Sequence, residues 1–228
     1  MISKGSPWYE YAVQTLPVPG GPEGTADRME WGTCAGVGPG SEVLGRSLRG
    51  RRVLELGCGQ GQNAAHLADR HHAQVTAVDL VDLQIQRARE RYGEVPGLTL
   101  LACDAMRFLQ HTETVFDIVY SVFGAVGLVE PGLLLAAIAR RVRPHGLLGF
   151  SVPHPGRPGA GSSRGHQPRH GTLRLPDGSR HPVARWELSV ADWRRYLLRS
   201  GLRTVAAREL GHPGRTHPTA LLVIARRN

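Results

Sequence analysis

A cluster of glycines and a carboxylate stand where two predicted strands end. Residues 53–61 read VLELGCGQG, an apolar run that leads into a glycine loop, and a second apolar run, VTAVD, ends at Asp79. Glycine has no Cβ, so the backbone of the loop can approach a ligand closely. Asp79 is placed to accept hydrogen bonds from the 2′- and 3′-hydroxyls of a ribose. The same carboxylate would repel a 2′-phosphate, so the pattern predicts a nucleoside site without that phosphate.

The spacing of the glycines argues against a dinucleotide. The dinucleotide fingerprint is G-x-G-x-x-G, and its third glycine allows close packing of helix and strand. Here Gly57, Gly59 and Gly61 form G-x-G-x-G, and Gln62 stands where the third glycine is required. An acid, Glu55, lies two residues before the loop. A carboxylate suits a cationic ligand and is a poor neighbour for a diphosphate.

This E-x-G-x-G-x-G pattern, with an acid eighteen residues beyond it, resembles the first motifs of the Rossmann-like, S-adenosylmethionine (SAM) dependent methyltransferases. The likeness runs from about residue 48 to 152 and resumes at the carboxyl end. It is nearest to bacterial small-molecule methyltransferases whose first motif continues G-Q-N and whose fifth strand ends in S-x-P-H-P, as residues 61–63 and 151–155 do here. The resemblance implies an α/β fold, a doubly wound, mostly parallel seven-stranded sheet with an antiparallel C-terminal strand.

The resemblance also implies a cofactor, SAM, with S-adenosylhomocysteine as its product, and residues that contact it. In the family, an acid after the third strand contacts the adenine amino group, and the next residue's backbone lies beside the ring; Asp104 and Ala105 match that place. The fourth strand lies under the transferable methyl and is followed here by Ser121 and Val122. The expected cofactor-binding residues are Glu55, Gly57, Cys58, Gly59, Gly61, Asn63, Asp79, Leu80, Asp104, Ala105, Ser121 and Val122.

Methyl transfer from a sulfonium needs little covalent help from a protein. The enzyme aligns the nucleophile, the methyl carbon and the sulfur in a line and excludes water, and a base is needed only when the acceptor is protonated at the working pH. His154 follows the fifth predicted strand, near the expected methyl end of the site. Histidine titrates near neutral pH, so we expect His154 to be the base. The alternative is a loop residue held between two prolines.

Aromatic side chains are the expected walls of an acceptor pocket. Tyr9, Tyr11 and Trp31 lie in the amino-terminal segment, which in related methyltransferases caps the SAM pocket. Phe123 follows the fourth strand, and Trp186 precedes a predicted helix. The alternative for the amino-terminal aromatics is hydrophobic packing of a tail.

Apolar runs alternate with amphipathic segments, which is typical of a parallel sheet covered on both faces. Prolines and glycines before residue 40 exclude a long helix there, and residues 41–48 are expected to form a helix that leads into the sheet. A P-D-G turn at 176–178 favours a weak hairpin. Strands are expected near 52–56, 74–78, 98–102, 115–121, 146–152, 202–209 and 219–226, and helices near 61–70, 82–92, 105–109, 131–141 and 188–200.

The length suits a single domain over residues 1–228. His166 and His170 have the spacing of metal ligands, but Pro168 lies between them in a segment without helical character, so we expect no metal. The expected parts of the domain are an N-terminal cap region (1–47), a SAM-binding core (48–152), a substrate lid (153–187) and a part that closes the sheet (188–228).

Composition narrows the classes of function. The net charge of +9 favours an anionic partner, but the arginines are dispersed and no run of five basic residues occurs. The sequence has neither an apolar stretch of eighteen residues nor an apolar amino-terminal segment, so we expect no membrane span and no secretory signal. Three cysteines without metal-ligand spacing predict free thiols, and we expect a cytoplasmic protein.

Three functions stay open at this stage. The first is methyl transfer to O, N, S or C of a small molecule, with secondary metabolism as the expected setting. The second is an RNA or DNA methyltransferase, suggested by charge, although residues 121–124 read SVFG in place of the N/D-P-P-Y/F element and no Pro-Cys element is present. The third is a SAM-binding protein without transfer activity. We favour the first; the acceptor stays open, as does the oligomeric state, for which a homodimer is one option.

Overall fold

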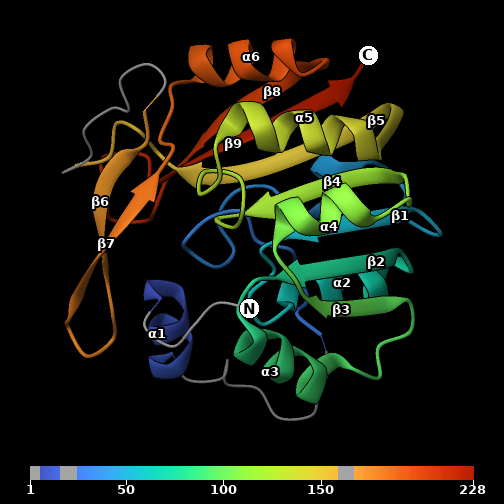
Figure 1. The fold of residues 1–228 in the computed structure, drawn as a ribbon, viewed down its shortest axis with the longest axis horizontal. Helices are drawn as coiled ribbons and strands as arrows, with labels where there is room; N and C mark the ends of the chain where they lie inside the picture. Colours follow the sequence, from blue (N-terminus) through green and yellow to red (C-terminus); the bar gives the residue numbers. More distant parts are fainter. Residues whose placement is uncertain (1–5, 16–24, 159–166) are drawn as a thin grey trace.

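The computed structural model describes residues 6–15, 25–158 and 167–228. Seven strands form one sheet in the order β3-β2-β1-β4-β5-β9-β8, and β9 runs antiparallel to both of its neighbours (Figure 1). The predicted sheet, mostly parallel with an antiparallel C-terminal strand, is therefore confirmed. The strands are β1 (Arg52–Leu56), β2 (Gln74–Asp79), β3 (Leu98–Ala102), β4 (Phe116–Val122), β5 (Val142–Pro153), β8 (Leu202–Leu210) and β9 (Ala220–Arg227).

Helices cover both faces of this sheet (Figure 1). Two follow β1 and β2 and pack on one face, and three others pack on the opposite face. In the part of the chain that the structure describes, no helix is long and apolar enough to cross a lipid bilayer. The helices of the first face are α2 (Gln62–His71) and α3 (Asp82–Tyr92), and those of the second are α4 (Ala105–His111), α5 (Pro131–Arg141) and α6 (Val190–Arg199).

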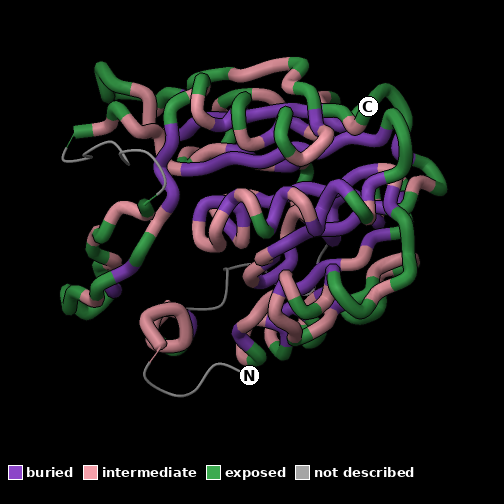
Figure 2. Tube along the Cα trace, turned by 45° about the horizontal axis from the view of Figure 1, so that its top comes forward, coloured by how far each residue is buried: buried purple, intermediate pink, exposed green. Residues whose placement is uncertain are grey.

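Each face has its own apolar core, and the buried strands separate the two (Figure 2). Phe150 and Trp193 pack edge to face beneath α6, with ring centroids 4.9 Å apart. On the other face Trp31 packs against Tyr120 at 6.0 Å and is completely buried, and its indole N–H donates to the carbonyl of Gly40. The prediction that Trp31 walls an acceptor pocket is therefore wrong, because its ring fills the core behind the sheet.

Two elements differ from those predicted by more than two residues. The expected helix at 41–48 is only a 3₁₀ turn, η1 (Ser41–Leu44), because Gly45 follows with a φ of 146°, which no helix accommodates. β5 begins at Val142, four residues before the predicted strand. Val142 pairs with Phe116 of β4 across an irregularity in the register, so β5 already belongs to the sheet there.

A short helix and a hairpin stand beside the sheet (Figure 1). Helix α1 (Pro7–Gln14) was not predicted, because prolines and glycines are frequent in the surrounding sequence. Pro7 lies in the first turn of the helix, where a proline is tolerated. Strands β6 (Arg169–Arg174) and β7 (Arg180–Arg185) form the predicted hairpin, longer than expected. Helix α1 contacts both α3 and β7.

Asp117 ties β1 and β5 to the start of β4 and is structural, as its place inside the fourth strand pattern suggests. Its carboxylate accepts from the backbone N–H of Arg52 at 2.8 Å and pairs with Arg51 at 3.1 Å and Arg143 at 2.8 Å. Burial raises the pKa of Asp117, but the hydrogen bonds and the two guanidinium groups outweigh it, and the net shift is downward.

We expect Asp117→Asn to lower the free energy of unfolding at pH 7 by about 1–2 kcal/mol, since both arginines are half exposed and their pairing is partly screened. A lowered pKa stabilises the fold above the ordinary pKa of aspartate, and that contribution disappears as the pH falls through the lowered value. Urea denaturation at pH 7 and at pH 3 measures both effects. Glu113→Gln, at an exposed residue, is the control. An equal cost at both pH values would contradict this account.

Candidate functional site

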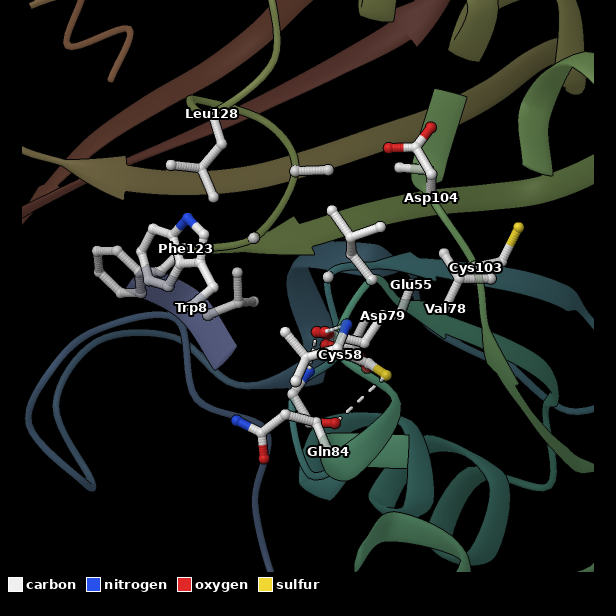
Figure 3. Close-up of a pocket in the computed structure, with 18 of the residues that line it drawn as sticks. Trp8, Glu55, Cys58, Val78, Asp79, Gln84, Cys103, Asp104, Phe123 and Leu128 are labelled. Carbon is white, nitrogen blue, oxygen red and sulfur yellow. Dashed lines mark hydrogen bonds between the residues drawn. The ribbon is translucent and has the colours of Figure 1, made fainter. Parts of the chain in front are cut away.

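A cavity of about 500 Å³ opens at the carboxyl ends of the parallel strands (Figure 3). It lies where the order of the strands reverses: the chain runs outward from β1 to β3 and then returns to place β4 on the other side of β1. Ligands of open α/β sheets bind at such a switch point, and the volume is typical of a ligand pocket. The expected cofactor-binding residues line this cavity, with the exceptions of Gly61 and Ser121.

The first two glycines of the loop have different roles. Gly57 has a φ of +78°, and a Cβ there would lie 2.7 Å from the Cα of Gly124, so the fold itself requires glycine at this residue. Gly59 has a φ of +55°, but a Cβ there would meet no atom within 4 Å. The space beside Gly59 therefore faces the cavity and can receive a ligand.

We expect Gly57→Ala to destabilise the protein much more than Gly59→Ala. The first substitution combines a backbone clash with a left-handed φ and should cost about 3 kcal/mol or more, whereas the second carries only the backbone strain of about 1 kcal/mol. Chemical denaturation of the two variants checks the difference. Equal losses would show that the Gly57–Gly124 approach is not a constraint of the fold.

Gly61 and Ser121 support the site from behind. Gly61 begins α2 with a φ of +78°, and a Cβ there would lie 3.3 Å from the Cβ of Ala88 on α3. Ser121 is fully buried; its Oγ donates to the carbonyl of Leu56 at 2.7 Å and accepts from the N–H of Val126 at 3.3 Å. Both predictions of direct cofactor contact are corrected, because one residue packs α2 against α3 and the other braces the loop after β4.

Asp79 closes β2 and presents a carboxylate to the cavity. One oxygen accepts from the N–H of Gly59 at 2.8 Å and the other from the N–H of Val81 at 2.9 Å. Burial raises its pKa above the usual value, against these backbone hydrogen bonds. Each oxygen has two lone pairs, so each retains an acceptor for a ligand hydroxyl. The carboxylate is thus held in one orientation for a two-pronged contact.

Glu55 lies one strand away, at the floor of the cavity, and is only 2% exposed. Burial raises its pKa to about 8; the hydrogen bond from the Tyr120 hydroxyl, 2.8 Å from Oε2, lowers it, and the negative charge of Asp79 raises it. The carboxyl is therefore protonated near neutral pH. A cation bound in the cavity would favour the ionised form.

We expect this buried carboxyl to make the stability of the protein depend on pH. Because the folded state retains a proton on Glu55 up to about pH 8, stability should fall as the pH rises from about 4.5 to 8, by at most about 1.4 kcal/mol per pH unit. Glu55→Gln keeps an acceptor for Tyr120 and should remove the slope. Thermal denaturation from pH 5 to pH 9 measures it, with the exposed Glu94→Gln as control. A slope unchanged in Glu55→Gln would refute the raised pKa.

Further polar groups complete this end of the cavity. Asp104 caps the N-terminus of α4 by accepting from the N–H of Arg107 at 2.8 Å, and Ala105 follows it at the wall. Asn63 exchanges two hydrogen bonds with the backbone of Glu30, at 3.0 and 3.1 Å, and so holds the preceding segment against α2. The side-chain oxygen of Gln84 is buried without a hydrogen-bond partner among the described residues. This acceptor is available to a ligand.

His154 does not line the cavity. Its Nε2 lies 3.2 Å from a carboxylate oxygen of Glu209, and its Nδ1 accepts from the N–H of Gly156 at 3.0 Å. Both ring nitrogens are thus used at the outer end of β5, beside β8. The ring thus links the end of β5 to β8, and the role of His154 as the catalytic base stays a prediction.

Some of the residues predicted to contact the acceptor line the cavity, and others do not. Tyr11 and Phe123 line the cavity. Phe123 has a φ of 49°, a strained backbone of the kind that collects at functional sites. Tyr9 lies at a separate, shallower depression beside α3. Trp186 is 6% exposed, and its backbone N–H donates to the carbonyl of Gly127 at 2.7 Å, so it packs under the loop after β4 and is not among the residues that line the cavity.

Several residues that line the cavity were not predicted from the sequence. Trp8 lies three residues before Tyr11, on the same face of α1. This spacing would have predicted Trp8 as a wall residue if Ser6-Pro7 had been identified as the start of a helix. Val81 and Gln84 lie at the start of the helix that follows Asp79, so the sequence could also have predicted them as wall residues. Further wall residues follow β4 in a loop without any periodic pattern: Gly124, Ala125, Leu128 and Val129.

No group of three His, Cys, Asp or Glu side chains with metal-binding geometry occurs in residues 6–15, 25–158 and 167–228. His166 lies outside the described residues.

The comparisons with known proteins agree with this geometry. Residues 53–146 match the family model described as a methyltransferase domain. The match extends from β1 into the first residues of β5, so this part of the chain is similar to a methyltransferase domain. The matched segment contains the glycine loop, Asp79 and Asp104, the residues on which the sequence resemblance was based.

Individual proteins are also similar to this chain. The O-methyltransferase rstn1 of Aspergillus nomiae is 32% identical over 43% of this chain and 44% of its own length. The chain thus matches less than half the length of this curated relative. A SAM-dependent methyltransferase from Mesorhizobium loti shares the fold of the domain, with a TM-score of 0.61 at 22% identity over 82% of this chain and 95% of that one.

A second solved structure contains bound ligands. It is the 1,6-didemethyltoxoflavin-N1-methyltransferase of Burkholderia thailandensis with 1,6-didemethyltoxoflavin and S-adenosylhomocysteine bound. It superposes with a TM-score of 0.57 at 22% identity, over 79% of this chain and 72% of that one. At this identity the likeness concerns the fold.

Proposed function

We propose that the protein transfers a methyl group from SAM to a small-molecule acceptor. The observation that carries the proposal is the meeting of three features around one cavity: the open face of Gly59, the carboxylate of Asp79 and the buried carboxyl of Glu55. A nucleoside with a free diol and a cationic amino acid arm is the ligand that suits all three.

The residues present fit this cofactor. Part of the cofactor can lie in the open space beside Gly59, and Asp79 can accept hydrogen bonds from the ribose hydroxyls. The side-chain oxygen of Gln84, which has no hydrogen-bond partner among the described residues, offers a further acceptor. Asp104 and Ala105 stand at the expected adenine end. When bound, SAM supplies an activated methyl group attached to a sulfonium.

The chain's own contribution is binding, alignment and exclusion of water. Trp8, Tyr11 and Phe123 cover the remaining end of the cavity with aromatic surface, which favours a flat, partly apolar acceptor. No histidine or lysine side chain lines this cavity among the described residues. We therefore propose that acceptors react best when their nucleophile is already deprotonated, or carries a free lone pair, at the working pH.

The relatives support a small-molecule acceptor, since their printed names describe O- and N-methyltransferases. Secondary metabolism is the setting we propose. The three cysteines, Cys34, Cys58 and Cys103, are free thiols, which supports a reducing compartment and hence the cytoplasm.

We expect Asp79→Asn to weaken binding of both SAM and S-adenosylhomocysteine by about 10–100-fold, because a charged acceptor for two hydroxyls is lost. Isothermal calorimetry measures both affinities, and the ligand-induced rise in melting temperature should shrink in parallel. Asp82→Asn removes an exposed carboxylate three residues away and should bind as the wild type does. Unchanged affinity in Asp79→Asn would refute the ribose contact; no binding to the wild type would refute the cofactor.

A further inference from the structure

The mouth of the cavity is built from segments far apart in the sequence. Trp8 and Tyr11 on α1 form part of its wall. Arg87 of α3 holds the end of this helix by donating to the carbonyls of Ala12 and Thr15 at 2.6 and 2.9 Å. The β6–β7 hairpin holds the helix from the other side. Its anchor is a pair of hydrogen bonds between Gln14 and Asp177, at 2.9 and 3.1 Å.

An arginine of this hairpin stands over the aromatic wall. The guanidinium carbon of Arg185 lies 5.7 Å from the centroid of the Trp8 ring, a cation–π contact. Arg185 has no side-chain hydrogen bond or ion pair to another residue that the structure describes. Its fork of five N–H donors is therefore free to bind an anion.

Two more arginines make this corner strongly positive. Arg157 and Arg169 contact the two oxygens of Glu187 at 2.6 and 2.8 Å, and Glu187 is only 2% exposed. The buried carboxylate of Glu187 thus interacts with the guanidinium groups of Arg157, Arg169 and Arg185. Its two oxygens already contact Arg157 and Arg169. Burial lowers the pKa of Arg185, as does repulsion by Arg157 and Arg169, while Glu187 raises it; the net shift is downward. A second anion would relieve this excess of positive charge.

The positive corner adjoins the end of the cavity opposite the proposed adenine site. In Figure 3, Trp8, Phe123 and Leu128 gather at one end, whereas Asp104 and Cys103 lie at the other. The backbone that follows Arg185 is fixed to the same end, because the N–H of Trp186 donates to the carbonyl of Gly127, directly before Leu128. Arg185 is thus attached to two walls of the acceptor end, α1 and the loop after β4.

We propose that the methyl acceptor carries a carboxylate or a phosphate group that pairs with Arg185 while its ring stacks against Trp8. This inference rests on the proposed function and names the acceptor's class. The carboxylate of Asp79 repels an anion from the cofactor end, so charge orients such an acceptor with its anionic group outward and its nucleophile inward. Arg185 is then a specificity-determining residue.

The test uses the full chain saturated with S-adenosylhomocysteine at low ionic strength. Benzoate, phenyl phosphate and the neutral benzamide are titrated as probes, with tryptophan fluorescence and calorimetry as readouts. We expect one or both anions to bind at least about tenfold more tightly than benzamide, and the preference to fall with added salt. The tighter of the two anions identifies the group that the acceptor carries. Equal affinity for all three probes, or no binding, would overturn the inference.

Three variants separate the possible causes. Arg185→Gln should lose the anion preference about tenfold or more while it retains the affinity for S-adenosylhomocysteine, and Arg185→Lys should restore part of it. Arg194→Gln removes the same charge from an exposed residue of α6 and should change nothing. An anion preference that survives in Arg185→Gln would overturn the assignment. If S-adenosylhomocysteine did not bind to the wild type, the proposed function would fail instead, and calorimetry reports that separately.

Discussion

The close approach of two backbones at the switch point is the constraint on which the site depends. A Cβ at Gly57 would lie 2.7 Å from Gly124, and a Cβ at Gly124 would lie 2.3 Å from the carbonyl oxygen of Leu56. Ser121 adds a hydrogen bond to that same carbonyl. The loops after β1 and β4 therefore meet without side chains between them. Because they meet there, the remaining space opens toward Gly59 and Asp79, where a ligand can enter.

Charge divides the resulting cavity into two ends. The cofactor end holds Glu55 and Asp79: burial raises the pKa of both carboxyls, and the negative charge of Asp79 raises that of Glu55 further. The opposite end lies beside the guanidinium of Arg185 and its two arginine neighbours on Glu187. A cationic cofactor and an anionic acceptor would each be drawn to its own end. In the proposed function, this division of charge would orient the two reactants in the cavity.

The cofactor half of the site was readable from the sequence because its residues follow strand ends in a periodic pattern. Gly57, Asp79 and Asp104 each come directly after an apolar run, and the sheet brings such residues to one edge. Gly61 and Ser121 also lie near strand ends, but they pack against the protein interior and do not line the cavity. The sequence pattern predicts the position of a residue along a strand or loop, but not the direction of its side chain. His154 follows β5, as the pattern indicates, but its neighbour Glu209 belongs to a distant strand that no local signal indicates.

The acceptor half could not be predicted, because its geometry depends on contacts between distant segments. Trp8 reaches the cavity only when α1 is held by Arg87 on one side and by Asp177, 163 residues beyond Gln14, on the other. Ordering these segments costs conformational entropy that only the assembled contacts repay. The acceptor end of the cavity therefore depends on the helix and the hairpin, whereas the opposite end is formed by residues that follow the strands of the core. In the proposed function, the chemistry of the acceptor depends on those two segments, where Trp8 and Arg185 meet.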